Sequence, residues 1–141
     1  MSISYDVEIS GENCRNEIFS ALFESGVEFT VEKNIEKRGA IGFFSESGMR
    51  VFYFDNRMDG WNESAAKDQP LTVDDMIEDW SISARISFIY INSKGEMCDN
   101  EIRNFVSALN ARVPSNFVLS FQYDKAYAIK KEGYLKWLVD F

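Results

Sequence analysis

An eight-residue segment occurs twice in this chain, and this repeat constrains the fold more than any other feature of the sequence. The first copy is GENCRNEI at residues 11–18, and the second is GEMCDNEI at residues 95–102. Six of the eight positions are identical, and both cysteines of the chain occupy matching places. Self-similarity of this kind indicates a structural unit that is used more than once. The repeat therefore predicts two similar units within one fold.

The segments on either side of the repeat match as well. Alternating residues typical of a strand precede each copy, at residues 3–9 and 86–91. A glycine-containing turn, an aromatic-rich strand and a closing aspartate follow at residues 46–55 and again at residues 131–140. We interpret the chain as a tandem duplication of a β-α-β-β-β unit. The two pseudo-repeats are expected at residues 1–55 and 82–141.

Two amphipathic helices are predicted at the repeat itself. The first, at residues 11–26, ends at a glycine that can form a left-handed C-cap. The second, at residues 97–111, is followed by Pro114, which cannot continue a helix. The apolar face is formed by Cys14, Ile18, Ala21 and Leu22 in the first helix and by Cys98, Ile102, Phe105, Val106 and Leu109 in the second.

Strands rich in β-branched and aromatic residues are expected after each helix. They are predicted at residues 27–33, 40–44 and 49–54 in the first half and at residues 117–123, 126–129 and 134–139 in the second. The expected fold class is α+β, with antiparallel sheets and two helices packed on one face. Because 141 residues are too few for two domains of ordinary size, the halves should share one core in a single domain, 1–141.

Composition adds an expectation about location. Although 45% of the residues are hydrophobic, no apolar run approaches the ~20 residues needed to cross a bilayer. The beginning of the chain lacks the basic and apolar stretches of a secretory signal, so we expect a cytoplasmic protein without membrane association. In that compartment the two cysteines would be reduced thiols.

The absence of histidine limits the chemistry open to this chain. It excludes Ser-His-Asp and Cys-His catalysis and histidine-ligated zinc. The sequence also contains no calcium-binding loop, no Cys-x-x-Cys pair and no glycine-rich phosphate loop. We therefore predict no catalytic residue, no metal site and no cofactor, and we expect a binding protein and not an enzyme.

The matched residues of the repeat have both a catalytic and a structural interpretation. Cys14 and Cys98 lie near helix N-termini, where the helix dipole could activate a thiol. Each cysteine is also four residues before an isoleucine on the same face, which favours core packing. Glu17 and Glu101, each preceded by an asparagine, could be paired catalytic carboxylates. They are predicted to be solvated helix residues, because nothing nearby explains a raised pKa.

An acidic insertion is predicted between the two halves, at residues 56–81. Of the net charge of −8, −6 lies within residues 55–79, which hold eight acidic and two basic residues. Residues 72–80 have the pattern of one or two helical turns with an N-cap. The residues predicted to bind a partner are Asp59, Trp61, Glu63, Asp68, Asp74, Asp75, Glu78, Asp79 and Trp80.

This insertion has two interpretations. It is a surface for a basic protein, because acidic residues steer the encounter and aromatic residues supply desolvated contact area. Alternatively, it is a solvated loop whose tryptophans pack back into the core. Four lysines near the end of the chain could form a basic patch that balances the acidic segment, but protection of an exposed edge strand is the favoured role. They are Lys125, Lys130, Lys131 and Lys136.

In the acidic and aromatic character of residues 55–80, the chain resembles the immunity proteins of bacterial toxin systems. The resemblance implies a basic toxin domain, often a nuclease, as the partner. It also implies stoichiometric occlusion, in which the acidic residues occupy the phosphate-binding groove of the toxin and the tryptophans anchor them. The net negative charge opposes binding to nucleic acid. Whether the protein is a monomer or a homodimer stays open.

Two other functions were considered. The doubled unit also resembles the effector-binding domains related to gyrase-inhibitory proteins, which implies a small molecule bound in a groove between the halves. Tyr5, Phe52, Phe54, Phe88 and Tyr90 could line such a groove, although filling of the core is the favoured role. No central buried glutamate for cation recognition is evident. The third alternative is a nucleic-acid-mimicking inhibitor, which would need its acidic charge spread over the whole surface.

Overall fold

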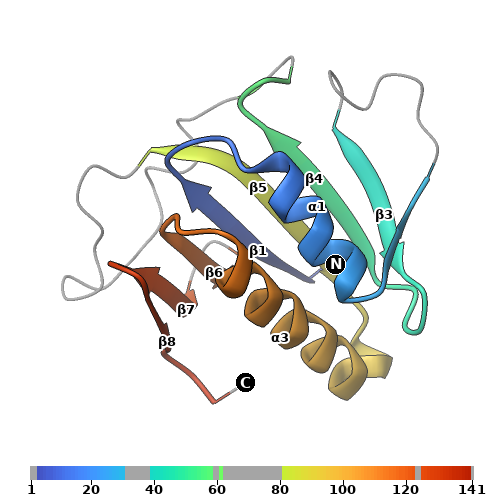
Figure 1. The fold of residues 1–141 in the computed structure, drawn as a ribbon. Helices are drawn as coiled ribbons and strands as arrows, with labels where there is room; N and C mark the ends of the chain where they lie inside the picture. The colour runs from blue at the N-terminus through green and yellow to red at the C-terminus, as the bar shows by residue number, and fades with distance from the viewer. Residues whose placement is uncertain (1–2, 31–38, 59–60, 62–80, 123–124, 141) are drawn as a thin grey trace.

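The computed structural model describes residues 3–30, 39–58, 61, 81–122 and 125–140 (Figure 1). The first half contains β1 (Ile3–Ser10), α1 (Arg15–Glu24), β2 (Val27–Phe29), β3 (Ala40–Phe44) and β4 (Arg50–Asp55). The second half contains β5 (Ile82–Tyr90), the 3-10 turn η3 (Asn92–Lys94), α3 (Gly95–Arg112), β6 (Phe117–Phe121), β7 (Lys125–Lys131) and β8 (Tyr134–Trp137). The predicted order of elements, β-α-β-β-β in each half, is confirmed.

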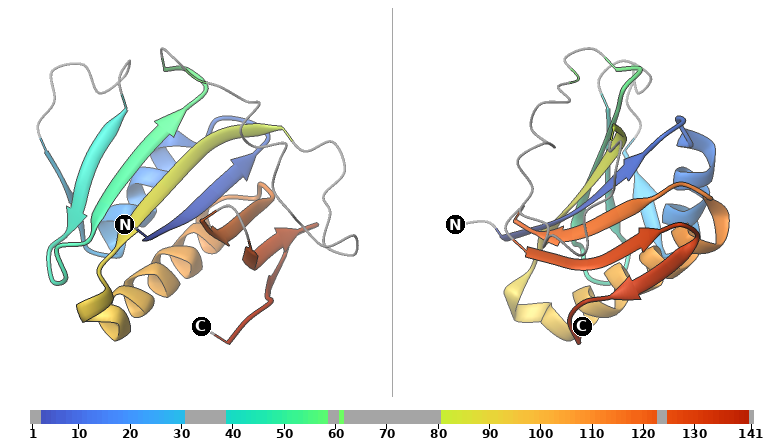
Figure 2. Two further views of the ribbon diagram at one scale, coloured as in Figure 1. Left: turned by 180° about the vertical axis from the view of Figure 1, so that it is seen from behind. Right: turned by 90° about the vertical axis from the view of Figure 1, so that its left-hand side faces the viewer.

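All eight described strands form one antiparallel sheet in the order β2-β3-β4-β5-β1-β6-β7-β8. Strands β1 and β5 lie at its centre and pair with each other along their whole length. Helices α1 and α3 both lie on the same face of this sheet (Figures 1 and 2). The predicted α+β class with two helices on one face is therefore confirmed, while the expectation of separate sheets is wrong because β1 and β5 join the halves.

The strand order does not repeat between the halves. The first half joins the centre through its last strand, since β4 pairs with β5. The second half joins through its first strand after the helix, since β6 pairs with β1. Exchanging the two halves would therefore not restore the same sheet. The two halves share their order of elements, but they pair with the centre of the sheet through different strands. Tandem duplication therefore stays a prediction.

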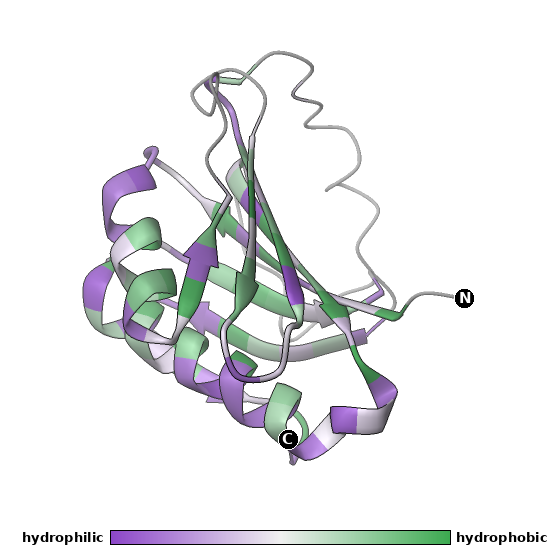
Figure 3. Cartoon of the chain, turned by 90° about the vertical axis from the view of Figure 1, so that its right-hand side faces the viewer, coloured by the Kyte–Doolittle hydropathy of each residue, from purple (hydrophilic) through white to green (hydrophobic). Residues whose placement is uncertain are grey.

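The core lies between the two helices and the sheet. Figure 3 shows the division, with hydrophobic residues along the strands and hydrophilic residues along the outer sides of the helices. The predicted apolar faces are confirmed, because Ile18, Ala21 and Leu22 are buried on α1, and Cys98, Ile102, Phe105, Val106 and Leu109 are buried on α3. These side chains meet alternate residues of the central strands, such as Val7 and Ile9.

The two cysteines are packing residues, as expected. Cys98 is fully buried, and Cys14 is half-buried against the same core. Both are free thiols. Burial raises the pKa of the Cys98 thiol, which disfavours the reactive thiolate form.

The bounds of several elements differ from the prediction, and one predicted element lies outside the described residues. Strand β5 begins at Ile82, four residues before the predicted start at residue 86. The alternation already holds there, because Ala84 faces the core while Arg85 on the other face forms an ion pair with Glu8 at 3.0 Å. Strand β2 ends at Phe29. The helical turns predicted at residues 72–80 lie outside the described residues.

Lys130 does not protect a sheet edge, which corrects the prediction for this residue. Strand β7 lies between β6 and β8, and Lys130 is only 4% exposed. Its Nζ donates hydrogen bonds to the carbonyl oxygens of Asn110 at 3.0 Å and Val113 at 2.5 Å, at the end of α3. Lys130 therefore satisfies carbonyl groups that the end of a helix leaves without partners. Lys136, on the outermost strand β8, is exposed, as an edge residue should be.

Replacing Lys130 with methionine should lower the free energy of unfolding by about 1–2 kcal/mol, because the last carbonyls of α3 lose a charged donor. Urea denaturation followed by circular dichroism would measure this change. Lys136→Met is the matched control, because it removes an exposed lysine from β8. This substitution should change stability by no more than about 0.5 kcal/mol. Equal effects of the two substitutions would contradict the capping role of Lys130.

Candidate functional site

Of the nine residues predicted to bind a partner, the structure describes Trp61. The other eight lie outside the described residues. They are Asp59, Glu63, Asp68, Asp74, Asp75, Glu78, Asp79 and Trp80. Trp61 and the two ends of the insertion are the described parts of this site.

The two ends of the insertion are held beside each other. The backbone N–H of Asn56, just after β4, donates to the carbonyl oxygen of Ser83 on β5 at 2.8 Å. The backbone N–H of Gly11 donates to the carbonyl oxygen of Ser81 at 3.1 Å. The hydroxyl of Ser83 donates in turn to the carbonyl oxygen of Ile9 at 3.3 Å. The acidic segment therefore leaves and rejoins the sheet at one place, next to the loop that precedes α1.

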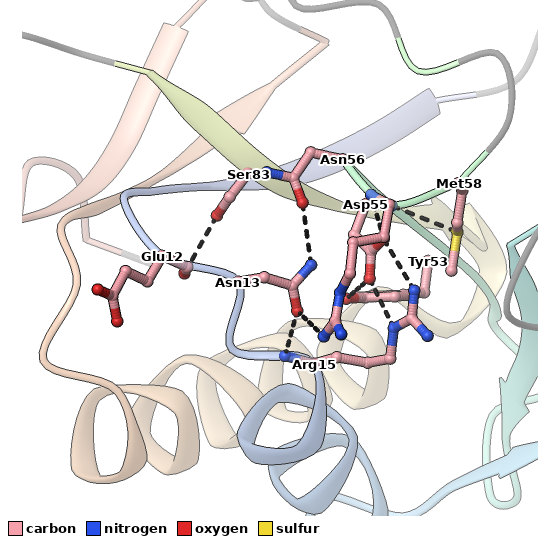
Figure 4. A network of polar contacts seen from close by, with 9 residues as sticks. Glu12, Asn13, Arg15, Tyr53, Asp55, Asn56, Met58 and Ser83 are labelled. Carbon is pink, nitrogen blue, oxygen red and sulfur yellow. Dashed lines mark hydrogen bonds and ion pairs between the residues drawn. The ribbon is translucent and has the colours of Figure 1, made fainter.

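A buried aspartate anchors the departing end (Figure 4). The side chain of Asp55, the last residue of β4, is fully buried. Its carboxylate accepts two hydrogen bonds from the guanidinium of Arg15, at 2.7 and 3.0 Å, and one from the hydroxyl of Tyr53 at 2.7 Å. The backbone N–H of Arg57 donates to the same carboxylate at 2.9 Å. Asp55 is thus a structural anchor and does not contribute to the acidic surface.

These contacts hold Asp55 in its ionised form. Burial by itself would raise the pKa of Asp55, but hydrogen bonds from Arg15, Tyr53 and the backbone of Arg57 outweigh burial and lower it to about 2. Burial and the neighbouring Asp55 together raise the pKa of Tyr53 well above its ordinary value. Tyr53 therefore remains a hydrogen-bond donor, and the charge of Asp55 persists at neutral pH.

Asn13 connects the insertion to the start of α1. Its Nδ2 donates to Oδ1 of Asn56 at 3.0 Å. Its Oδ1 accepts hydrogen bonds from Nη2 of Arg57 at 2.7 Å and from the backbone N–H of Arg15 at 3.0 Å. Together with Asp55, these contacts place the first residues of the insertion against α1. The hydrogen bond from the Arg57 guanidinium is charge-assisted, and such bonds are among the stronger ones in proteins.

Trp61 lies on the face of the sheet that the helices leave uncovered. Its ring packs on Phe54 of β4, with 5.5 Å between ring centroids. The guanidinium of Arg85 on β5 lies over the same ring at 5.7 Å, a cation–π contact. Phe54 and Arg85 are register partners, and their neighbours Tyr53 and Ala84 are buried in the helix-covered core. Trp61 is half-buried, so part of its ring packs on its own sheet, outside the core that the helices cover.

Exposed apolar residues continue this face on the neighbouring strand. On β3, Ile41 is 38% exposed and Phe43 is 37% exposed. Phe52 on β4 is the register partner of Ile41 and is half-buried. The uncovered face therefore carries an apolar strip, made of Ile41, Phe43, Phe52, Phe54 and Trp61, beside the place where the acidic segment begins.

The five aromatic residues considered for a ligand groove do not share one surface. Tyr5 and Phe88 are buried beneath the helices, with ring contacts to Tyr90 at 5.2 Å and to Phe105 at 5.4 Å respectively. Phe52 and Phe54 belong to the opposite face of the sheet. Tyr5 and Phe88 therefore fill the core, as the favoured interpretation held, and a groove lined by all five residues is ruled out by the sheet that separates them.

Glu101 is the functional candidate that the sequence analysis placed wrongly. Glu17 is exposed as predicted, but Glu101 at the matching position of α3 is only 7% exposed. Burial raises the pKa of Glu101. A signal for this burial was present in the sequence, because Glu101 is three residues after Cys98 and four before Phe105, on the apolar face of the helix.

Comparison with known proteins found no matching family model, no matching curated protein and no matching solved structure. Neither helix in the described part of the chain has the length and apolar character needed to cross a membrane.

Proposed function

We propose that this protein is an inhibitor of the immunity type, which binds a basic protein in the cytoplasm and blocks its active site. The binding surface would combine the acidic insertion, residues 56–81, with the apolar strip on the uncovered face of the sheet. The observation that carries the proposal is the position of Trp61, which belongs to the acidic segment and packs on Phe54 of β4, the strand next to the exposed apolar residues of β3.

Charge supports a basic partner. Seven acidic residues within residues 56–79 are opposed by Arg57 and Lys67. Asp55, the eighth acidic residue of residues 55–79, is already paired with Arg15 and adds nothing to the surface. Acidic groups gathered in one segment raise the rate of encounter with a basic protein and disfavour nucleic acid and anionic lipid.

The apolar strip supports a protein as the partner. Stable protein interfaces have an apolar centre surrounded by polar groups, and aromatic residues are enriched in that centre. Ile41, Phe43 and Trp61 would supply such a centre, and the acidic segment would supply the polar surround. If the partner is a nuclease, the acidic residues would occupy the positions of substrate phosphates in its active-site groove.

The repeat itself supports a special role for the base of the insertion. We infer that the two halves descend from one unit and that the first copy was adapted to hold the insertion. The copies differ at two positions, where Asn13 and Arg15 in the first copy correspond to Met97 and Asp99 in the second. Asn13 and Arg15 are the residues that hold Asp55, Asn56 and Arg57.

The proposal is tested by recovering the partner and measuring the salt dependence of the complex. Full-length protein immobilised at low salt should retain one basic protein at equal stoichiometry, identified by mass spectrometry. The dissociation constant of the purified pair should then rise steeply between roughly 50 and 300 mM salt, because screening weakens the acidic contacts. A complex whose affinity does not respond to salt would contradict the acidic surface, and the absence of any stoichiometric complex would contradict inhibition by occlusion.

A further inference from the structure

A second site lies at the opposite end of β4 from Trp61. There the turn between β3 and β4 covers the beginning of α3, and a hollow of about 590 Å³ remains between them. Glu46 of the turn lines one side, and Lys94, Met97, Asn100, Glu101 and Asn104 line the other. Volumes of this size are within the range of small-molecule sites.

One oxygen of the Glu101 carboxylate in the hollow lacks a partner, although Ser47 donates hydrogen bonds to this carboxylate. Glu101 is more than nine-tenths buried, and its Oε1 is buried and has no hydrogen-bond partner in the described part of the chain. A buried carboxylate oxygen without a donor is costly, and such groups are normally paired. The nearby amine of Lys94 is engaged elsewhere, because its Nζ donates to the carbonyl oxygen of Ser47 at 2.9 Å. The hollow therefore offers an unused acceptor at its base.

The other groups that line the hollow indicate the charge of a suitable ligand. Glu46 and Glu96 add two carboxylates to that of Glu101, against the single amine of Lys94. Asn104 adds a side-chain amide, Oδ1 of Asn100 already accepts a hydrogen bond from Nη1 of Arg103 at 3.1 Å, and Met97, which is 40% exposed, adds an apolar surface. Among the described residues no three acidic or thiol side chains converge closely enough to share a metal ion. These groups suit an organic cation with several N–H donors.

We propose that this hollow binds a guanidinium group, with Glu101 as the buried carboxylate that receives it. A guanidinium is planar, holds its N–H donors in a fixed fork and is less strongly hydrated than an ammonium group, so it tolerates a partly buried pairing with a carboxylate. The thioether and methyl of Met97 would pack on the flat face of the group. The guanidinium could come from a free arginine-like molecule or from an arginine side chain of another protein.

This site goes beyond the proposed inhibitor function. The hollow lies beside the turn that precedes β4, and Trp61 comes after the end of β4. Each surface can therefore be changed while the other stays intact. Failure of the guanidinium site would leave the acidic insertion unaffected, and loss of the basic partner would leave the hollow unaffected.

Titration of the full chain with N-acetylarginine amide tests the proposal directly. The methyl NMR signal of Met97 reports binding at the hollow, and the neutral citrulline analogue is the matched control ligand. We expect the arginine compound to bind with a roughly millimolar dissociation constant and the citrulline compound to bind at least about tenfold more weakly. Free arginine and a blocked Gly-Arg-Gly peptide distinguish the two sources of the group. Equal binding of the charged and neutral compounds, or no shift of the Met97 methyl, would overturn the proposal.

Substitutions at the two matching positions of the repeat complete the test. Glu101→Gln should weaken binding about tenfold or more, because a charge-assisted pair is lost, while Glu17→Gln on the exposed face of α1 should leave binding unchanged. Because burial raises the pKa of Glu101, removing its charge should not lower the unfolding temperature at pH 7. Should Glu101→Gln fold poorly, Glu46→Gln at the rim should weaken binding about threefold. Wild-type affinity in the Glu101→Gln variant would contradict the assignment.

Discussion

Replacing Asp55 with alanine should lower the free energy of unfolding by about 3–5 kcal/mol, because it removes the partner of a largely buried guanidinium. The guanidinium of Arg15, only 14% exposed, would lose its two hydrogen bonds to a fully buried carboxylate. The hydroxyl of Tyr53 and the backbone N–H of Arg57 would lose their acceptor as well. Chemical denaturation at pH 7, followed by circular dichroism, would measure the loss.

The exposed ion pair between Arg112 and Glu24 is the matched control. Its N···O distance of 2.7 Å equals that of the Arg15–Asp55 pair, but its side chains are 42% and 56% exposed. Because solvent screens exposed pairs, Glu24→Ala should cost less than about 1 kcal/mol. A similar loss in the two variants would show that burial is not what makes the Asp55 contacts important.

The same contacts make stability depend on pH in a defined direction. Folding lowers the pKa of Asp55 from 3.8 to about 2, so the folded state favours the ionised carboxylate. This contribution, about 2 kcal/mol, is fully present above the ordinary pKa and is lost as the pH falls from about 4 towards 2. Comparison of wild-type and Asp55→Ala unfolding free energies across this range should show the difference between them shrinking as the pH decreases.

Neutralising Asp74, Asp75, Glu78 and Asp79 together, as the corresponding amides, should weaken binding of the basic partner about a hundredfold at low salt. Each interfacial charge is expected to contribute roughly 0.5–1 kcal/mol, and most of the loss should appear as slower association. The affinity of the variant should also depend less on salt concentration, because fewer charges are left for salt to screen. Surface plasmon resonance with the recovered partner at several salt concentrations would measure both quantities. We expect the variant to remain folded, because the core of α1, α3 and the sheet is unchanged.

A second four-residue variant separates local charge from total charge. Glu12, Glu28, Glu132 and Asp140 are exposed acidic residues outside the insertion. Changing these four to amides removes the same total charge and should weaken binding much less, by roughly threefold or below. If the two variants bind equally weakly, the overall charge of the protein drives association and the insertion is not the binding surface.

Local pattern was sufficient to identify most elements of this fold. The spacing of Ile18, Ala21 and Leu22 identified the buried face of α1, and the matching pattern identified that of α3. The strand at residues 40–44 was predicted with the bounds that the structure has. These features were accessible because the periodicities of helices and strands depend on residues close together in the chain.

Three features of the candidate sites depended on contacts between distant residues. Lys130 has the sequence appearance of a surface lysine, and only the position of β7 beside the end of α3 makes it a buried helix cap. Glu101 became buried because the turn between β3 and β4 covers α3 there. Arg15 and Asp55 meet across forty positions of the chain. No periodicity within a short segment indicates the contacts of Lys130 or the Arg15–Asp55 pair, whereas the place of Glu101 on the apolar face of α3 is a local signal of its burial.

The sequence by itself determined the element order, the apolar faces of both helices and the concentration of acidic residues between the two halves, because each of these is a property of neighbouring residues. The tertiary structure alone decided that the halves share one sheet through β1 and β5, with β4 and β6 docked on either side. It also decided which matching residues of the repeat take different roles. Asn13 and Arg15 hold the base of the insertion and Glu101 lies at the base of a hollow, because hydrogen bonding and burial depend on what the fold places against each side chain.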